Sequence, residues 1–227
     1  MAGPVLACRG ADPCSPWLHS MEALQREDSD GLARTLAADY VDGLGARKEA
    51  LADAHRWWAA PADFDIRHLT CRRLPSNRTF ESPRWTEVAV ELDADIPGPV
   101  PWRVEGPFRS AVVRGLDARI RSGWLVELRS AQRVASALSQ ARAPGDVRDL
   151  LHPDFRQGWT DRAEAARAWG SRRLAVTHGR LELRERGAHL DLFHRGFEDP
   201  RLGRVLRLTL KPAAGRLRIA AGLPGLD

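Results

Sequence analysis

The strongest constraint in this sequence is an internal match between two segments that lie 115 residues apart. Residues 39–50, DYVDGLGARKEA, align without a gap with residues 154–165, DFRQGWTDRAEA. Asp, Gly, Arg, Glu and Ala coincide, and Tyr40 aligns with Phe155. A spacing of this size is that of a small domain and is too long for the repeats of a solenoid. The match therefore indicates that one unit has been duplicated.

The fold class that follows is α+β, with two tandem units. The first is expected over residues 15–130, and the second, shorter unit over residues 131–227. Each is expected to pack about three helices on a curved antiparallel sheet of about four strands. A chain of 227 residues can bury two cores of that size.

Three helices are predicted in the first half. The first begins at Ser15 and Pro16, because serine caps a helix well and proline loses nothing in its first turn. A second begins near residue 30, and a third covers about residues 46–59, where apolar side chains recur at helical spacing.

Strands are predicted after these helices. In residues 86–96, apolar side chains alternate with Glu and Asp, which is typical of a sheet with one solvated face. The other predicted strands of the first half cover residues 64–74, 102–120 and 124–129, with a hairpin turn at residues 121–123. The second half is predicted to repeat this order, with helices at 131–142 and after 144 and 161, and strands near 174–186, 188–198, 203–211 and 215–221.

This order of elements resembles the nuclear transport factor 2-like family. The features that carry the resemblance are the acidic and aromatic pair Asp39-Tyr40, a following glycine, a helix opened by Arg47, and four strands that end in a Gly-Trp or Gly-Arg hairpin. The resemblance covers about residues 17–130 and again 131–221. It implies a cone of helices and a bent sheet around a pocket. The family includes ketosteroid isomerase-like and epoxide hydrolase-like enzymes, protein-binding modules, and bacterial secreted or lipoprotein members.

We expect a bacterial protein without catalytic activity that binds a small apolar ligand or a protein partner. The alternative is a pocket enzyme of ketosteroid isomerase or epoxide hydrolase type, with acid-base chemistry from Tyr40, Asp42 and His55. The isomerases that the resemblance implies usually carry their tyrosine on the first helix, whereas Tyr40 precedes the third. Since Phe155 replaces it in the other half, a packing role for Tyr40 is favoured.

Aromatic side chains of the first unit are the predicted lining of a pocket. Six of the eight tryptophans lie there. Trp57 and Trp58 are neighbours on one helix and cannot face the same core, so one of them can line a pocket or meet the second unit. The alternative is a large aromatic core. The predicted ligand-binding residues are Tyr40, Trp57, Trp58, Trp102 and Trp124.

Charge and composition argue against several partners. The formal net charge is +5, but the basic residues are scattered among 30 acidic ones, so no nucleic-acid surface is expected. No run of about 18 apolar residues occurs, so no transmembrane segment is expected. No cofactor is expected, and no metal site, because no carboxylate or cysteine joins His178, His189 and His194 at ligand spacing. The sheet faces could also pair two copies into a homodimer.

The three cysteines leave two interpretations open. Cys8 follows Val-Leu-Ala, which has the form of a lipobox. If the true start lies upstream, Cys8 would carry a lipid on a periplasmic lipoprotein, and Cys14 and Cys71 would remain as a pair able to form a disulfide. As the chain is given, a cytoplasmic protein is expected.

Two acidic residues and two arginines are shared by the matching segments. We expect Asp39 to pair with Arg47, and Asp154 with Arg162, eight residues on in each case. Each pair would hold a loop against the helix that follows it, a structural role rather than a ligand site.

Overall fold

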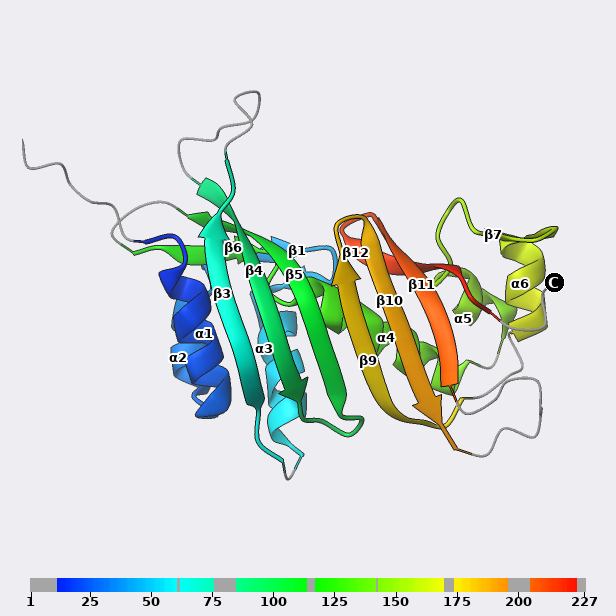
Figure 1. Cartoon of the computed structure of the whole chain (residues 1–227), viewed down its shortest axis with the longest axis horizontal. Coiled ribbons are helices and arrows are strands. Elements are labelled where there is room, and N and C mark those ends of the chain that lie inside the picture. The colour runs from blue at the N-terminus through cyan, green and yellow to red at the C-terminus, as the bar shows by residue number, and fades with distance from the viewer. Residues whose placement is uncertain are drawn as a thin grey trace, which may run out of the picture.

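A single mixed sheet of eight strands runs through both halves of the chain (Figure 1). The computed structural model describes residues 12–60, 62–75, 85–113, 117–141, 143–169, 174–195 and 205–223. The strand order is β12-β11-β10-β9-β5-β4-β3, and β6 pairs with β5. The strands are β3 (Asp65–Arg73), β4 (Trp85–Ile96), β5 (Trp102–Val113), β6 (Arg119–Ser122), β9 (Val176–Arg184), β10 (Gly187–His194), β11 (Val205–Ala213) and β12 (Arg216–Ala221).

This sheet corrects the predicted fold class. Two separate sheets of about four strands were expected, whereas β5 and β9 pair in parallel and join the two halves. At the start of this pairing Trp102 lies opposite Gly179, where a Cβ atom would stand 2.5 Å from the indole ring. Sequence alternation shows which face of a strand is buried but not which strand lies beside it, so the junction was not predicted.

Six helices are described, and α3 and α4 lie behind the sheet in the view of Figure 1. Asp28 Oδ1 caps α2 by accepting a hydrogen bond from Gly31 N at 2.7 Å. Glu49 Oε2 does the same for Ala46 N, at 2.9 Å, where α3 begins. The helices are α1 (Ser15–Gln25), α2 (Ser29–Thr35), α3 (Arg47–Trp58), α4 (Val126–Gln140), α5 (Pro144–Arg148) and α6 (Arg162–Trp169).

One predicted strand of the first half is wrong. Residues 124–129 were expected to be a strand, but α4 begins at Val126. The hairpin expected at residues 121–123 is also displaced, because β5 ends at Val113 and β6 already covers Arg119–Ser122. The apolar residues of this segment fit both the period of a strand and the period of a helix. Trp124, Val126 and Leu128 alternate as in a strand, while helical spacing relates Leu128, Ala131, Ala135 and Leu138.

The two matching segments adopt the same local structure. Each forms a two-stranded hairpin that leads into a helix, β1 (Val41–Asp42) with β2 (Gly45–Ala46) before α3, and β7 (Arg156–Gln157) with β8 (Thr160–Asp161) before α6. The residues before the hairpins also correspond, because Leu36 bridges Ile120 and Leu151 bridges Ile219.

The ion pairs expected within these segments have other partners in the structure. Arg47 donates a hydrogen bond from Nη2 to the carbonyl oxygen of Ala33, and Arg162 donates to Arg148 O at 2.9 and 3.1 Å. Asp39 lies 3.6 Å from Arg121. Each arginine therefore ties its helix to the preceding helical segment through a carbonyl oxygen and not through the aspartate.

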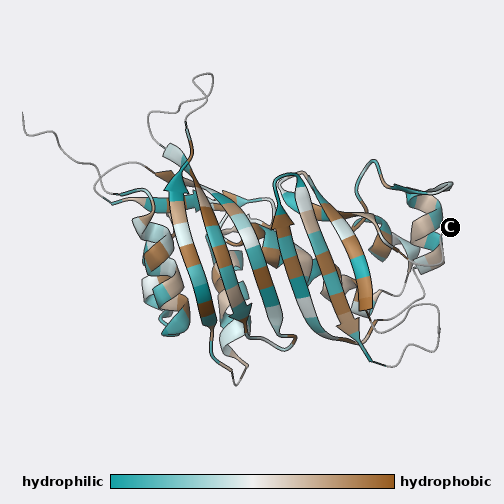
Figure 2. Ribbon diagram, viewed as in Figure 1, coloured by the Kyte–Doolittle hydropathy of each residue, from teal (hydrophilic) through white to brown (hydrophobic). Residues whose placement is uncertain are grey.

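The sheet has one apolar face and one charged face. Apolar and polar bands alternate along the strands (Figure 2), and the buried members, such as Val90, Leu92 and Val104, pack into one core cluster that includes residues of both halves. The other face of the sheet carries ion pairs. It therefore does not offer the apolar surface that a homodimer formed through the sheet would need. These pairs are Arg67 with Asp95, Arg103 with Asp93, Arg180 with Glu105, and Arg207 with Asp191.

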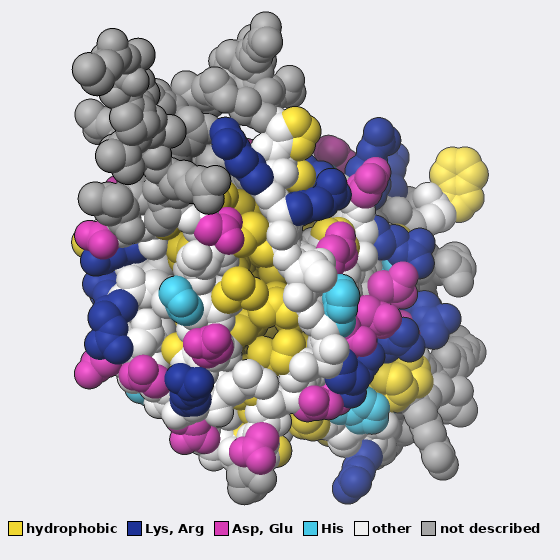
Figure 3. Space-filling view, turned by 60° about the vertical axis from the view of Figure 1, so that its left-hand side comes forward, with side chains coloured by type: hydrophobic (Ala, Val, Ile, Leu, Met, Phe, Trp, Pro, Cys, Tyr) yellow, Lys and Arg dark blue, Asp and Glu magenta, His cyan; other side chains and the backbone are white. Residues whose placement is uncertain are grey.

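A second view shows how the charges are distributed on the surface. On the face in Figure 3, Lys and Arg side chains lie among Asp and Glu side chains, and hydrophobic side chains are exposed between them. Neither sign of charge forms a continuous patch on this face. None of the helices in the described part of the chain has the length and apolar character needed to span a bilayer.

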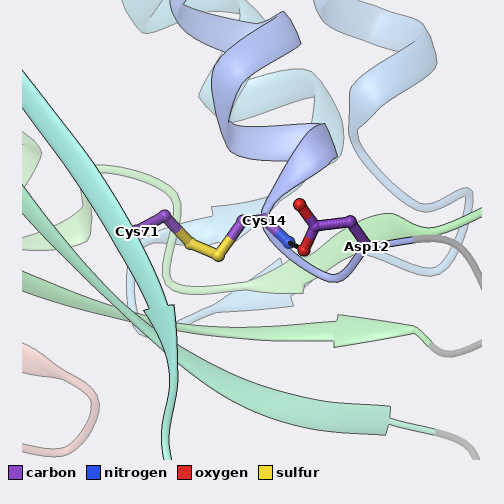
Figure 4. Close-up of a disulfide and its surroundings, with 3 residues drawn as sticks. All are labelled: Asp12, Cys14 and Cys71. Carbon is purple, nitrogen blue, oxygen red and sulfur yellow. Dashed lines mark hydrogen bonds between the residues drawn. A yellow bond between two sulfur atoms is a disulfide. The ribbon is translucent and has the colours of Figure 1, made fainter.

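A disulfide joins Cys14, just before α1, to Cys71 on β3 (Figure 4). The two Cα atoms lie 5.7 Å apart, and Cys14 N donates a hydrogen bond to Asp12 Oδ1 at 3.0 Å. The pairing that the cysteine count left open is therefore present. The predicted lipid-carrying residue, Cys8, lies outside the described residues.

Candidate functional site

A cavity of about 730 Å³ lies between helices and sheet near the junction of the two halves. This volume is in the range that small-molecule sites occupy. Residues from α3, from the loop after β4, from α4 and from the segment that leads into β9 line it. They are Asp53, Arg56, Trp57, Gly98, Pro99, Val100, Trp102, Arg129, Gln132, Arg133, Ala135, Ser136, Ser139, Gln140, Leu174, Ala175 and Val176.

Aromatic and aliphatic side chains form much of the cavity wall. Trp57 is buried, and its ring centroid lies 5.8 Å from that of Trp124. Its Nε1 donates a hydrogen bond to Gln132 Oε1 at 3.0 Å, which fixes the indole against α4. Trp102 is also buried and enters the cavity from the start of β5, close to the segment that leads into β9. Ser136, a lining residue of α4, is exposed, so the cavity reaches the surface there.

A buried ion-pair cluster underlies this wall. Arg129 on α4 has no exposed side-chain surface, and its Nε donates to Asp53 Oδ2 at 2.5 Å. Its Nη1 donates to Asp42 Oδ2 at 2.7 Å. Arg56 pairs with the other oxygen of Asp53, Oδ1. Because buried charges are costly unless they are paired, the cluster fixes α4 against α3 and the β1–β2 hairpin.

Tyr40 completes the cluster from the side away from the cavity. Its hydroxyl donates to Asp42 Oδ2 and accepts a hydrogen bond from Trp124 N at 3.2 Å. Burial, and then the charge of Asp42, raise the pKa of Tyr40 well above its usual value, while Arg129 lowers it by less. The phenol is therefore protonated at any ordinary pH.

The structure brings together only two of the three predicted acid-base residues. Tyr40 and Asp42 are in contact, whereas His55 is exposed on α3 and lies 3.2 Å from Ser29 Oγ. Neither Tyr40 nor Asp42 is among the described residues that line the cavity. Asp53 does line it, but both of its oxygens are held by arginines. Among the described residues of the lining, no carboxylate is therefore free to act as a general base.

Two of the five predicted ligand-binding residues, Trp57 and Trp102, line the cavity. Tyr40 lies beyond the ion-pair cluster. Trp58 points elsewhere and donates from Nε1 to Leu24 O at 2.9 Å. Trp124 is fully buried, and its Nε1 donates to Ser20 Oγ at 3.3 Å. Trp124 therefore belongs to the buried core, and Trp58, which is partly buried, packs against it.

Sequence reasoning missed the charged residues of the cavity. Asp53 carried a usable signal, because it interrupts the apolar stripe of α3 between Ala50 and Trp57. A carboxylate at such a position needs a buried cation. Arg129 could not be recognised as that cation while its segment was interpreted as a strand.

No cluster of metal-ligating side chains is present in the parts of the chain that the structure describes. His178, for example, stacks on Phe193 with ring centroids 4.0 Å apart on the charged face of the sheet. Comparison of the chain with protein-family models, with curated proteins and with solved structures finds no match. The function proposed below therefore rests on the geometry of the cavity.

Proposed function

We propose that this protein binds a small, largely apolar ligand in the cavity between α3, α4 and the sheet. The observation that carries the proposal is the cavity itself, which has a volume of about 730 Å³ and is walled by Trp57 and Trp102. Aromatic walls with a few polar groups are typical of small-molecule sites. The proposal includes a relation to the nuclear transport factor 2-like family, because a pocket between helices and a curved sheet is what that resemblance implies.

A binding role is favoured over catalysis by the state of the acidic groups. Asp53 and Asp42 are each engaged by Arg129, and Tyr40 is held protonated behind them. Such a network stabilises one arrangement of side chains and leaves no group in the described lining ready to accept a proton.

The disulfide supports a second part of the proposal, the compartment. Disulfides form and persist in oxidising environments and are rare in the reducing cytosol. We therefore propose that the protein acts outside the cytosol. Alkylation of the protein isolated from its native cells, before and after reduction, tests this, since Cys14 and Cys71 should react only after reduction. Reaction of both thiols without a reductant would contradict it.

Binding can be tested with N-phenyl-naphthylamine, an uncharged aromatic probe whose fluorescence rises in apolar sites. We expect saturable binding to the full chain at one site. Ser136→Trp places an indole at the open side of the cavity and should weaken binding by about tenfold or more, about 1.4 kcal/mol. Ala52→Trp places the same group on the exposed face of α3, away from the lining, as a matched control. Equal binding by the Ser136→Trp and Ala52→Trp proteins would show that the probe does not enter this cavity.

A further inference from the structure

The charges around the cavity do not cancel. Arg56, Arg129 and Arg133 line it, and the carboxylates that face these arginines are Asp53, in the lining, and Asp42, behind it. Three arginines against two aspartates leave one formal positive charge. The other charges that act on Arg133, those of Glu49 and Arg216, are of opposite sign and do not change this sum. Asp53 uses one oxygen for Arg129 and the other for Arg56, so no carboxylate oxygen of Asp53 is left for Arg133.

Arg133 holds the charge that remains. It lies one helical turn beyond Arg129 on α4, so both guanidinium groups are on the same side of the helix. Arg133 has no ion-pair partner within 4 Å among the residues that the structure describes. Partial burial, and then the positive charge of Arg129, lower the pKa of Arg133. An anion beside Arg133 would stabilise its charged form and so oppose both effects.

Arg129 also has an unused donor. Its Nε and Nη1 are bound to carboxylates, but its buried Nη2 has no hydrogen-bond partner in the described part of the chain. A buried donor without a partner is costly, by about 1–3 kcal/mol, and is retained in few native structures. Gln132 adds another donor at the same wall, because Trp57 uses its carbonyl oxygen and leaves its amide nitrogen available.

We propose that the ligand carries one anionic group, a carboxylate or a similar oxyanion, which binds to Arg133 and, after a shift of the Arg129 side chain toward the cavity, to its buried Nη2. The apolar part of the ligand packs on Trp57 and Trp102. This inference rests on the proposed function, since it needs the same cavity to be the binding site. Guanidinium groups bind oxyanions through charge-assisted hydrogen bonds, which are about twice as strong as neutral ones. A singly charged anion would balance the formal charge of the site, and a ligand without charge would leave both donors unused.

Two probes with one aromatic skeleton separate this inference from the proposed function. Anilinonaphthalene sulfonate is N-phenyl-naphthylamine with an added sulfonate, so the ratio of the two dissociation constants measures what the anion contributes. For the wild-type chain we expect the sulfonate to bind about tenfold or more tightly than the neutral probe, about 1.4 kcal/mol. The two probes should also compete for one site, and Ser136→Trp should weaken the binding of both.

The matched variants are Arg133→Gln and Arg73→Gln. Both remove one exposed positive charge, but Arg73 lies on β3 and does not line the cavity. We expect Arg133→Gln to lower the preference for the sulfonate by about tenfold and Arg73→Gln to retain it. Binding of the neutral probe with no preference for the sulfonate would overturn this inference and leave the proposed function standing. A preference that persists in Arg133→Gln would place the anion elsewhere and overturn it as well. If neither probe binds, the proposed function fails too.

Discussion

Removal of the Cys14–Cys71 disulfide should destabilise the protein strongly. The bridge closes a loop between residues that are 57 apart in the sequence. In the chain-entropy model, a loop of that length contributes about 4 kcal/mol to the free energy of unfolding, because the unfolded chain loses conformational freedom. The loop contains α1, α2, the β1–β2 hairpin and α3, so the bridge constrains most of the helical layer of the first half. Little strain opposes this gain, since the Cα separation of 5.7 Å is ordinary for a disulfide.

The assay is thermal unfolding of the Cys14→Ala/Cys71→Ala protein under non-reducing conditions. For a chain of this size, 4 kcal/mol corresponds to a fall in Tm of roughly 8–16 °C. Wild-type protein treated with a thiol reductant should show the same fall, and Cys8→Ala, which removes the third cysteine, should show none. If the double variant and the wild type unfold at the same temperature, or if reduction has no effect, then the bridge does not constrain the unfolded chain and the reasoning is refuted.

Three further expectations concern single side chains. Arg129→Met leaves Asp42 and Asp53 buried without their shared cation, so the free energy of unfolding in urea should fall by about 3–5 kcal/mol. A fall below about 1 kcal/mol would show that water already screens the cluster. Burial, and then the charge of Asp42, raise the pKa of Glu127 from 4.5 to about 7, so the folded protein retains a proton that the unfolded chain releases. The free energy of unfolding should therefore fall by on the order of 3 kcal/mol between pH 4.5 and 7, and urea titrations of Glu127→Gln should lack this fall. Gly43→Ala would place a Cβ atom 2.1 Å from Gly215 O and should lower stability by about 1–3 kcal/mol, whereas Gly145→Ala, with open space around it, is the control that thermal unfolding should leave nearly unchanged.

Local structure was largely predictable, because capping groups and apolar spacing act over a few residues. Helix α1 does begin at Ser15, although its N-cap is Cys14 and no side chain caps it, so the capping role expected of Ser15 was wrong. The alternation in residues 86–96 does correspond to β4. The matching segments were also expected to behave alike, and both form a hairpin before a helix. What the residues could not show is the parallel pairing of β5 with β9, because nothing in a strand's own sequence identifies its neighbour.

The candidate site was predictable only in its apolar part. Trp57 and Trp102 could be proposed as lining residues, since large aromatic side chains are usually buried in a core or in the wall of a pocket. The charged part depended on the assignment of residues 124–129. As a strand, that segment would place Arg129 on a solvated face, whereas as the first turn of α4 it turns the guanidinium toward Asp53. The apolar residues of this short segment fit the period of a strand as well as that of a helix, so the sequence alone did not reveal the ion-pair cluster.

The cluster uses residues that differ between the two matching segments. Tyr40 and Asp42 correspond to Phe155 and Gln157, so the hydroxyl and the carboxylate of the first segment have no counterparts in the second. Gln157 has other partners than Asp42, since its Oε1 accepts hydrogen bonds from the backbone nitrogens of Gly222 and Leu223 at 3.0 Å each. The second hairpin is therefore held by a neutral side chain that binds the end of the described chain.

The same 115-residue offset places Ala168 opposite Asp53. A cation in the position of Arg129 would find Gln157 and Ala168 where the first half has Asp42 and Asp53, and burying it against these neutral side chains would cost several kcal/mol without compensation. The buried ion-pair cluster therefore forms beside α3 and the first hairpin, where Asp53 and Asp42 lie. Because Arg129 is already neutralised there by two aspartates, the charge that a ligand meets depends on Arg133, which faces the same cavity from one turn further along α4. The features that the two segments share form the same hairpin twice, whereas Asp42, which only the first segment has, pairs with Arg129 and holds α4 beside the first hairpin.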